Sequence, residues 1–216
     1  MSYLATPAEW DWLISVAPDD EWMGLDSETD GHDVKESSPA HRARIDIWSV
    51  GLPSHEISPR GYRKYTGYVF PEAALWYEPI RAWLARSKWV VHNSNHDRHA
   101  LARYGIRLTH VYDTLEVCRL LWPGRHGYGL KKLRAEVLGK PERDGFVDLV
   151  TEIVGVTKTG KWKEEQVPIR SITPDHVKFS AKVAYAAEDA VDAPELREMC
   201  LARAQELTFK LPEMPW

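Results

Sequence analysis

Hydrophobic and polar residues alternate in short segments of the first half of the chain, as they do in strands whose two faces differ. Residues 21–28 and 43–52 carry this pattern, and residues 65–70 form a third strand-like run. A short apolar run at residues 88–93 and the segment 110–114 predict two more strands. The pattern therefore predicts a sheet of about five strands.

Other segments show apolar residues at helical spacing. The first, at residues 6–16, opens with a capping box and a proline in its first turn. Further helices are predicted at residues 71–87, 95–104, 115–121, 128–138 and 174–206. Pro194 interrupts the last, and we expect it either to kink that helix or to open a new one capped by Asp192. Early strands followed by alternating helices and strands indicate an α/β fold with a mixed sheet.

Size and charge limit the class of protein. We expect one domain over residues 1–216, because a chain of this length can bury a single core. The formal charge of -4, from 32 acidic and 28 basic residues, argues against a protein that coats nucleic acid through an overall basic field. Residues 140–173 are rich in Gly, Lys, Thr and Pro, and we expect an irregular, mobile loop there.

Cysteine usage and hydropathy indicate the compartment. Cys118 and Cys200 lie far apart without paired spacing, which favours buried, reduced thiols inside a cell. No apolar stretch has the length of a membrane span, and the N-terminus lacks the pattern of a signal peptide. We therefore expect a cytoplasmic protein without a membrane partner.

The stretch LDSETDG at residues 25–31 crowds three carboxylates at the end of the first long strand. Residues i and i+2 of a strand point to the same face, so Asp26 and Glu28 would lie side by side. Such a pair is either solvated or shares a cation, and Mg²⁺ and Mn²⁺ prefer oxygen ligands. Asp30 is expected to face water or to cap the next turn.

Two further groups lie on predicted helices. Asn93 and Asp97 follow a short buried strand, where an ordinary helix cap would also account for them. Tyr185 and Asp189 are four residues apart and share one face of an alanine-rich helix. Each group alone has a purely structural explanation.

Taken in order, Asp-x-Glu, Asn-x-x-x-Asp and Tyr-x-x-x-Asp resemble the three motifs of the DEDD superfamily of 3'-5' exonucleases, in the subgroup with tyrosine in the last motif. The likeness is greatest to the proofreading domain of family A DNA polymerases. It extends to DSETD at 26–30, YDT at 112–114, GRH at 124–126 and YAAEDA at 185–190. The resemblance covers roughly residues 22–200 and implies a ribonuclease H-like fold.

The same resemblance implies a site with two Mg²⁺ or Mn²⁺ ions. Four carboxylates would hold them, and the first would bridge both: Asp26, Glu28, Asp97 and Asp189. Two such ions stabilise the entering and the leaving oxygen in phosphodiester hydrolysis. Tyr185 would orient the attacking water as a neutral hydroxyl, since the ordinary pKa of tyrosine is about 10.

Contacts to the nucleic acid are expected from four other side chains. Thr29 and Asn93 would touch the terminal nucleotide, and Arg125 would hold a phosphate. Trp162, between two lysines of the irregular loop, would stack on a base or anchor the loop to the body.

The sequence thus predicts a metal-dependent exonuclease that releases nucleoside monophosphates from DNA 3' ends, preferably single-stranded or frayed ones. The chain ends near the close of the exonuclease-like region, so we expect a free-standing enzyme or an excised piece. A separate DNA polymerase, for which the enzyme would edit, is a candidate partner. A compact, tryptophan-rich chain would suit a bacteriophage.

Three other interpretations stay open. The first is an RNA 3'-5' exonuclease akin to ribonuclease D, which uses the same motifs. The second is a non-catalytic nucleic-acid-binding or polymerase-accessory module. The third is a zinc site formed by His92, His96 and His99.

Overall fold

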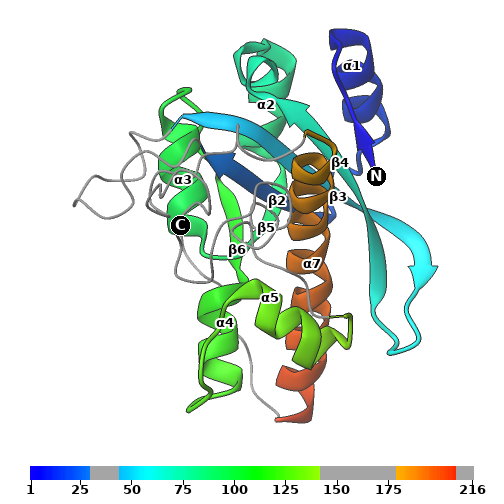
Figure 1. Cartoon of the computed structure of the whole chain (residues 1–216), viewed down its shortest axis with the longest axis vertical. Helices are drawn as coiled ribbons and strands as arrows, with labels where there is room; N and C mark the ends of the chain where they lie inside the picture. Colours follow the sequence, from blue (N-terminus) through cyan, green and yellow to red (C-terminus); the bar gives the residue numbers. More distant parts are fainter. Residues whose placement is uncertain (30–43, 142–178, 208–216) are drawn as a thin grey trace, which may run out of the picture.

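The computed structural model describes residues 1–29, 44–141 and 179–207, which are built around one six-stranded sheet (Figure 1). Its strands are β1 (Ser2–Tyr3), β2 (Trp22–Thr29), β3 (Ile45–Ile57), β4 (Arg63–Pro71), β5 (Lys88–Val91) and β6 (His110–Asp113). Their order across the sheet is β1-β4-β3-β2-β5-β6. The neighbours β2, β3 and β4 are antiparallel, whereas β5 and β6 run parallel to β2. The mixed sheet is therefore confirmed, and β1, too short to show a pattern, is the additional strand.

Helices cover both faces of the sheet. They are α1 (Pro7–Val16), the 3-10 helix η2 (Glu72–Trp76), α2 (Glu78–Arg86), α3 (Ser94–Ala102), α4 (Thr114–Leu121), α5 (Leu130–Leu133), the π-helix η3 (Arg134–Leu138) and α7 (Phe179–Glu206). One face of the sheet packs with α1, α2 and α3 in the largest apolar core, which includes Leu25 of β2. The other face carries α7, whose Ala186 and Ala187 pack on Ile47 and Val69.

The predicted helices are present in the described part of the chain. The capping box of α1 is confirmed, because Glu9 N–H donates to Thr6 Oγ1 and Thr6 N–H donates to Glu9 Oε2. Residues 71–87 hold two helices, η2 and α2, since Pro79 starts the second within its first turn. Most of the expected loop at 140–173 lies outside the described residues.

A row of glycines lets α7 approach the sheet closely. Gly24, Gly51 and Gly67 face one another in register across β2, β3 and β4. A Cβ on Gly24 or Gly51 would overlap the main-chain carbonyl of Ala190 in α7. The absence of three side chains thus brings the backbone of α7 against the strand that carries Asp26 and Glu28.

Pro194 neither ends α7 nor starts a new helix, so the predicted helix opening capped by Asp192 is wrong. The residue lies inside α7, which runs unbroken from Phe179 to Glu206. Proline has no N–H for the carbonyl four residues earlier, and that carbonyl belongs to Ala190. This carbonyl lies against Gly24 and Gly51. We infer that the close packing of α7 on the sheet at this point lets the helix continue past Pro194.

A second apolar cluster joins α4, η3 and the last turns of α7. It includes Leu121, Leu133 and Leu196, together with both cysteines. Cys118 and Cys200 are buried free thiols with their Sγ atoms 3.6 Å apart, which confirms the predicted burial. This cluster attaches α5 and η3 to α7, beside which they lie in Figure 1.

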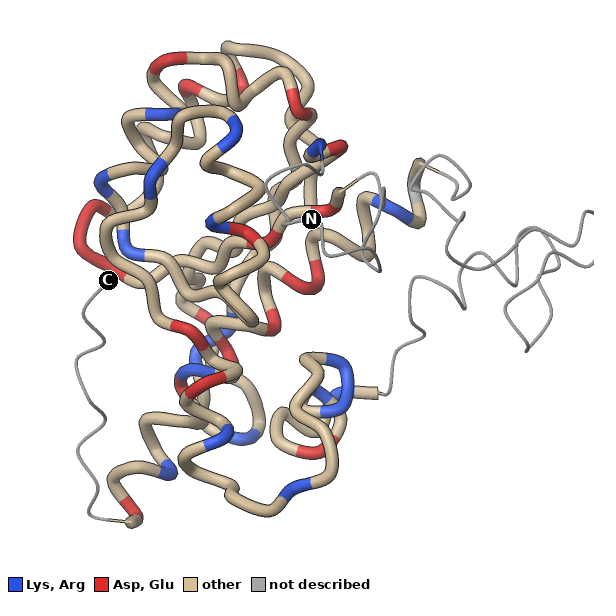
Figure 2. Tube along the Cα trace, turned by 90° about the vertical axis from the view of Figure 1, so that its left-hand side faces the viewer, with Lys and Arg blue, Asp and Glu red and all other residues tan. Residues whose placement is uncertain are grey.

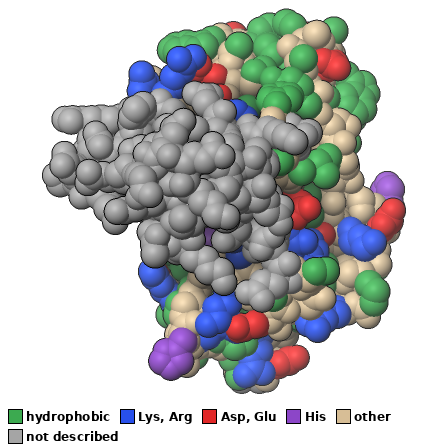
Figure 3. Space-filling model, in the orientation of Figure 1, with side chains coloured by type: hydrophobic (Ala, Val, Ile, Leu, Met, Phe, Trp, Pro, Cys, Tyr) green, Lys and Arg blue, Asp and Glu red, His purple; other side chains and the backbone are tan. Residues whose placement is uncertain are grey.

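Charge is mixed over the surface of the described residues. Figure 2 shows Lys and Arg interspersed with Asp and Glu along the trace. In Figure 3 hydrophobic side chains gather toward the upper part, where α1 and α2 lie in Figure 1; Trp12 and Trp76 are among the exposed apolar residues. Within the described ranges, each helix is too short or too polar to span a bilayer.

Candidate active site

Three carboxylates meet where β2 ends beneath α7. Asp26 and Glu28 lie two residues apart on β2, and Asp189 comes from α7. Each offers an oxygen such that the three oxygens lie within 4.8 Å of one another. Strand alternation aligns the first two, and the contact between Ala190 and Gly24 brings in the third. The structure thus assembles three of the four predicted metal ligands.

Like charges this close repel unless a cation or a proton compensates them. The donor set here is three carboxylates without sulfur or nitrogen, which fits a hard cation such as Mg²⁺ or Mn²⁺. Asp189 is buried, so water alone screens its charge poorly. The residues present therefore fit the divalent cation that the sequence predicts.

Asp97, the fourth predicted ligand, lies outside this group of three. It is buried in the first turn of α3, and Ser27 Oγ donates a hydrogen bond of 2.6 Å to its Oδ1. Ser27 stands between Asp26 and Glu28 on β2. Burial raises the pKa of Asp97 to about 6, against the opposing effects of His96 and of the hydrogen bonds from Ser27. The carboxylate is thus adjacent to the acidic strand and close to its protonation point near neutral pH.

Tyr185 lies one helical turn before Asp189 on α7 and is buried. Its hydroxyl accepts a hydrogen bond from Nζ of Lys131, a residue of α5 that lies 54 positions earlier. The sequence analysis did not identify Lys131, because the spacing of residues on α5 carries no signal for a contact with a distant helix.

Asn93 adopts a left-handed conformation, with φ 68° and ψ 56°, directly before α3. Asp113 holds it there: one carboxylate oxygen accepts from the Asn93 N–H at 3.1 Å, and the other from the Ser94 N–H at 2.8 Å. The same carboxylate caps α4 through the Leu115 N–H at 2.9 Å. The Asp of the YDT segment therefore positions the start of the helix that carries Asp97.

The remaining side chains predicted to contact the nucleic acid, Thr29 and Arg125 among the described residues, lie in different environments. Thr29 ends β2, where the register with β3 shifts. Arg125 is 17% exposed and paired with Glu136. Trp162 and Asp30 lie outside the described residues.

The three histidines do not gather into a cluster of possible metal ligands in the described part of the chain. His92 Nδ1 lies 2.9 Å from Thr114 Oγ1, whereas His99 Nδ1 lies 2.6 Å from the Asn95 carbonyl oxygen. Burial lowers the pKa of His92 to about 4, so its ring is neutral at pH 7. The geometry gives the zinc interpretation no support.

Asp192, to which the sequence assigned no role, belongs to a buried ionic cluster. Its oxygens lie 2.6 Å from Lys140 Nζ and 3.4 Å from Arg134 Nη1. Lys140 also pairs with Glu195 at 2.5 Å, and Arg134 pairs with Glu188. This cluster fastens η3 and the residues after it to α7, so Asp192 has a structural role.

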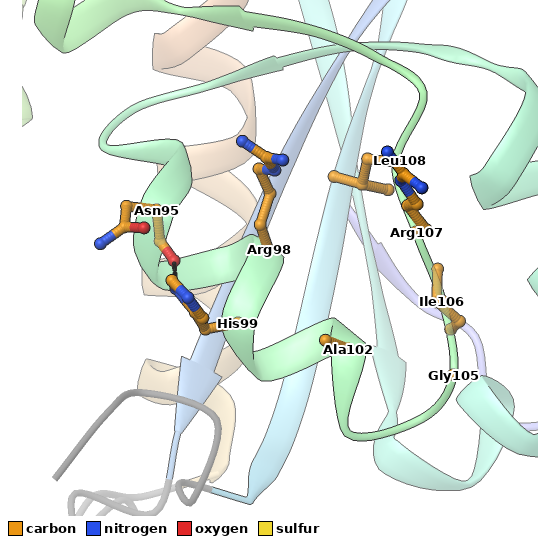
Figure 4. Close-up of a pocket in the computed structure, with 8 residues that line it drawn as sticks. All are labelled: Asn95, Arg98, His99, Ala102, Gly105, Ile106, Arg107 and Leu108. Atoms are coloured by element: carbon orange, nitrogen blue, oxygen red, sulfur yellow. Dashed lines mark hydrogen bonds between the residues drawn. The ribbon is translucent and has the colours of Figure 1, made fainter. Parts of the chain in front are cut away.

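A hollow of about 450 Å³ lies between α3 and the residues that follow it (Figure 4). It is lined by Asn95, Arg98, His99 and Ala102 of α3 and by residues 105–108. None of the three clustered acids lines it, so it is separate from the acidic group.

Comparison with known proteins identifies the class that this fold and acidic site define. A sequence model described as 3'-5' exonuclease matches residues 8–198. The chain belongs to this 3'-5' exonuclease family, which confirms the resemblance found in its motifs. No curated protein sequence matches the chain.

Solved structures show the same fold at low sequence identity. NrnC of Brucella melitensis superposes with a TM-score of 0.61 at 18% identity, over 96% of this chain and 82% of that one. RNase D of Trypanosoma brucei in complex with RNA U12 gives 0.61 at 16% identity, over 93% and 62%. The POL domain of Pol1 from M. smegmatis with a DNA primer-template gives 0.55 at 17% identity, over 96% and 28%. These likenesses confirm the ribonuclease H-like α/β fold.

Proposed function

We propose that this exonuclease domain uses a divalent cation to release nucleoside monophosphates from the 3' end of DNA, with single-stranded or frayed ends preferred. The observation that carries the proposal is the meeting of Asp26, Glu28 and Asp189 within 4.8 Å of one another. A non-catalytic module would have no need to hold three acids together at that cost in repulsion.

In this proposal the three acids would hold Mg²⁺ or Mn²⁺. Asp97, which accepts a hydrogen bond from Ser27 of the same strand, would be the fourth acid available to a pair of such ions. When bound, such ions neutralise phosphate charge and make hydroxide available from water near neutral pH. The protein's own contribution is to fix the oxygens on a strand and two helices, so that little reorganisation is needed when substrate binds.

Tyr185 would orient the attacking water through its hydroxyl, one turn of α7 away from Asp189. Thr29 and Asn93 would contact the terminal nucleotide, since each stands at the end of a strand or the start of a helix beside an acid. Arg125 would hold a phosphate by exchanging its ion pair with Glu136 for the phosphate oxygens. Trp162 keeps its proposed role as a stacking platform.

Removal of RNA ends is the second candidate function. It is favoured by the likeness to the Trypanosoma brucei RNase D solved with RNA U12 and to Brucella melitensis NrnC solved with pGG. The motif likeness to the proofreading domain favours DNA.

A separate DNA polymerase is the partner that the proposed removal of DNA 3' ends suggests.

A direct experiment separates these functions. The purified protein is incubated with 5'-labelled single-stranded DNA, duplex DNA and RNA of one sequence, with Mg²⁺, Mn²⁺ or a chelator. We expect a descending ladder on single-stranded DNA that requires metal. A ladder on RNA alone would move the assignment to the RNA candidate, and retention of intact strands under all conditions would overturn the proposal of catalysis.

A further inference from the structure

Lys131 of α5 contacts Tyr185 in two ways. Its Nζ donates a hydrogen bond to the tyrosine hydroxyl oxygen, and the same Nζ lies 4.5 Å from the centroid of the tyrosine ring. Tyr185 is 8% exposed and Lys131 is partly buried, so this contact is shielded from water. A hydrogen bond from a charged donor in such a place is stronger than one at the surface.

The direction of this hydrogen bond is fixed by the chemistry of the two groups. An ammonium has three N–H donors and no acceptor, so the tyrosine oxygen must accept. The tyrosine hydroxyl hydrogen therefore points away from Lys131 to a different acceptor. Lys131 thus sets both the place of the hydroxyl oxygen and the direction of its hydrogen, on the helix face that Tyr185 shares with Asp189.

The segment that carries Lys131 is held in place by contacts that do not involve Tyr185. Leu133, two residues later, is fully buried in the apolar cluster with α7. Arg134 pairs with Glu188 and lies 3.4 Å from Asp192, and both of these acids belong to α7. The segment that carries Lys131 is thus fixed to α7, the helix that also carries Tyr185.

We propose that Lys131 is a positioning residue of the exonuclease reaction, which orients the Tyr185 hydroxyl toward the attacking water. This inference rests on the proposed function of the site. It assigns a part in the reaction to a residue outside the three motifs, on a segment far from them in the sequence.

The test uses the full chain and a matched pair of variants, Lys131→Met and Lys132→Met. Lys132 is the neighbouring lysine, exposed, whose Nζ contacts the His126 carbonyl instead of Tyr185. We expect Lys131→Met to lower the single-turnover cleavage rate about 10- to 100-fold, the loss typical of a charged hydrogen bond or a misplaced group. The substrate KM, the Mn²⁺ affinity and the Tm should stay close to those of the unchanged protein. Lys132→Met should leave the rate unchanged, and Lys131→Arg should recover part of it.

A double-mutant cycle with Tyr185→Phe supplies the readout that a structural role would not move. Phenylalanine keeps the ring and removes the hydroxyl, so Lys131→Met should cause no further loss of rate in that background. An equal loss in both backgrounds would overturn the inference, as would an unchanged rate in Lys131→Met itself. A wild-type protein without nuclease activity would instead refute the proposed function, which keeps the two failures distinct.

Discussion

Gly24 of β2 lies directly against the main-chain carbonyl of Ala190 in α7, closer than any side chain at position 24 would allow. Because Asp189 precedes Ala190 and Asp26 follows Gly24 by two residues, this backbone contact sets the distance between the two acids. A methyl group at position 24 would push α7 away from the sheet.

We therefore expect Gly24→Ala to destabilise the protein by about 3 kcal/mol, the upper part of the range for overpacking. The same variant should lose Mn²⁺ affinity, because Asp189 moves away from Asp26. Urea unfolding and Mn²⁺ titration followed by electron paramagnetic resonance would measure both. Gly129→Ala is the control, since a Cβ at Gly129 meets no atom within 4 Å; equal behaviour of the two variants would contradict the close-approach account.

Asp113 accepts hydrogen bonds from three backbone N–H groups at the starts of α3 and α4. We expect Asp113→Ala to cost about 2 kcal/mol in the free energy of unfolding, as the loss of a strong helix cap does. Asp113→Asn should cost less, because its remaining oxygen still accepts. Denaturant unfolding of the two variants gives the comparison, and equal stability of all three proteins would show that the caps contribute nothing.

The raised pKa of Asp97 predicts a pH dependence of the metal-free protein. A carboxyl with a pKa of about 6 in the folded protein, against an ordinary value of 3.8, binds a proton more tightly in the native state than in the unfolded chain. The protonated Asp97 side chain therefore contributes its full stabilisation below pH 3.8, and this stabilisation is lost as the pH rises through 6. The free energy of unfolding falls by at most about 3 kcal/mol over this range.

Asp97→Asn removes this titration and keeps an oxygen for the Ser27 hydroxyl. In chelator we expect the variant to be more stable than the unchanged protein at pH 8 and to differ little at pH 4. Thermal unfolding across this pH range measures the difference, and a constant difference at all pH values would show that Asp97 does not titrate as described. Added Mn²⁺ should stabilise the unchanged protein more than the variant.

Asp26→Ala and Tyr185→Phe should affect catalysis differently. Asp26 is proposed as a ligand of both ions, so its loss should abolish cleavage while the circular dichroism spectrum stays native. Tyr185→Phe should slow single-turnover cleavage and leave Mn²⁺ affinity nearly intact. Wild-type turnover by Asp26→Ala, or an unchanged rate in Tyr185→Phe, would refute the role given to that residue.

Much of the site could be predicted because its signals are local. The i, i+2 relation of Asp26 and Glu28 and the i, i+4 relation of Tyr185 and Asp189 follow from strand and helix periods. Strands β2 to β6 and the capped helix α1 were predicted for the same reason.

What could not be predicted depends on contacts between distant segments. The glycines of three strands each look like ordinary strand interruptions until the register aligns them under α7. Pro194 looks like a helix breaker in the sequence, because the sheet glycines against which the Ala190 carbonyl packs are distant along the chain. Lys131 gives no sign of its partner, and the capping role of Asp113 appears only when α3 and α4 start side by side.

The central claim is that acids distant in the sequence hold a divalent cation together. Crystals soaked in Mn²⁺ and measured at the manganese absorption edge test it most directly. The account predicts an anomalous peak in contact with carboxylate oxygens of Asp26, Glu28 and Asp189. Well-ordered carboxylates that point apart, with no anomalous peak among them, would contradict it.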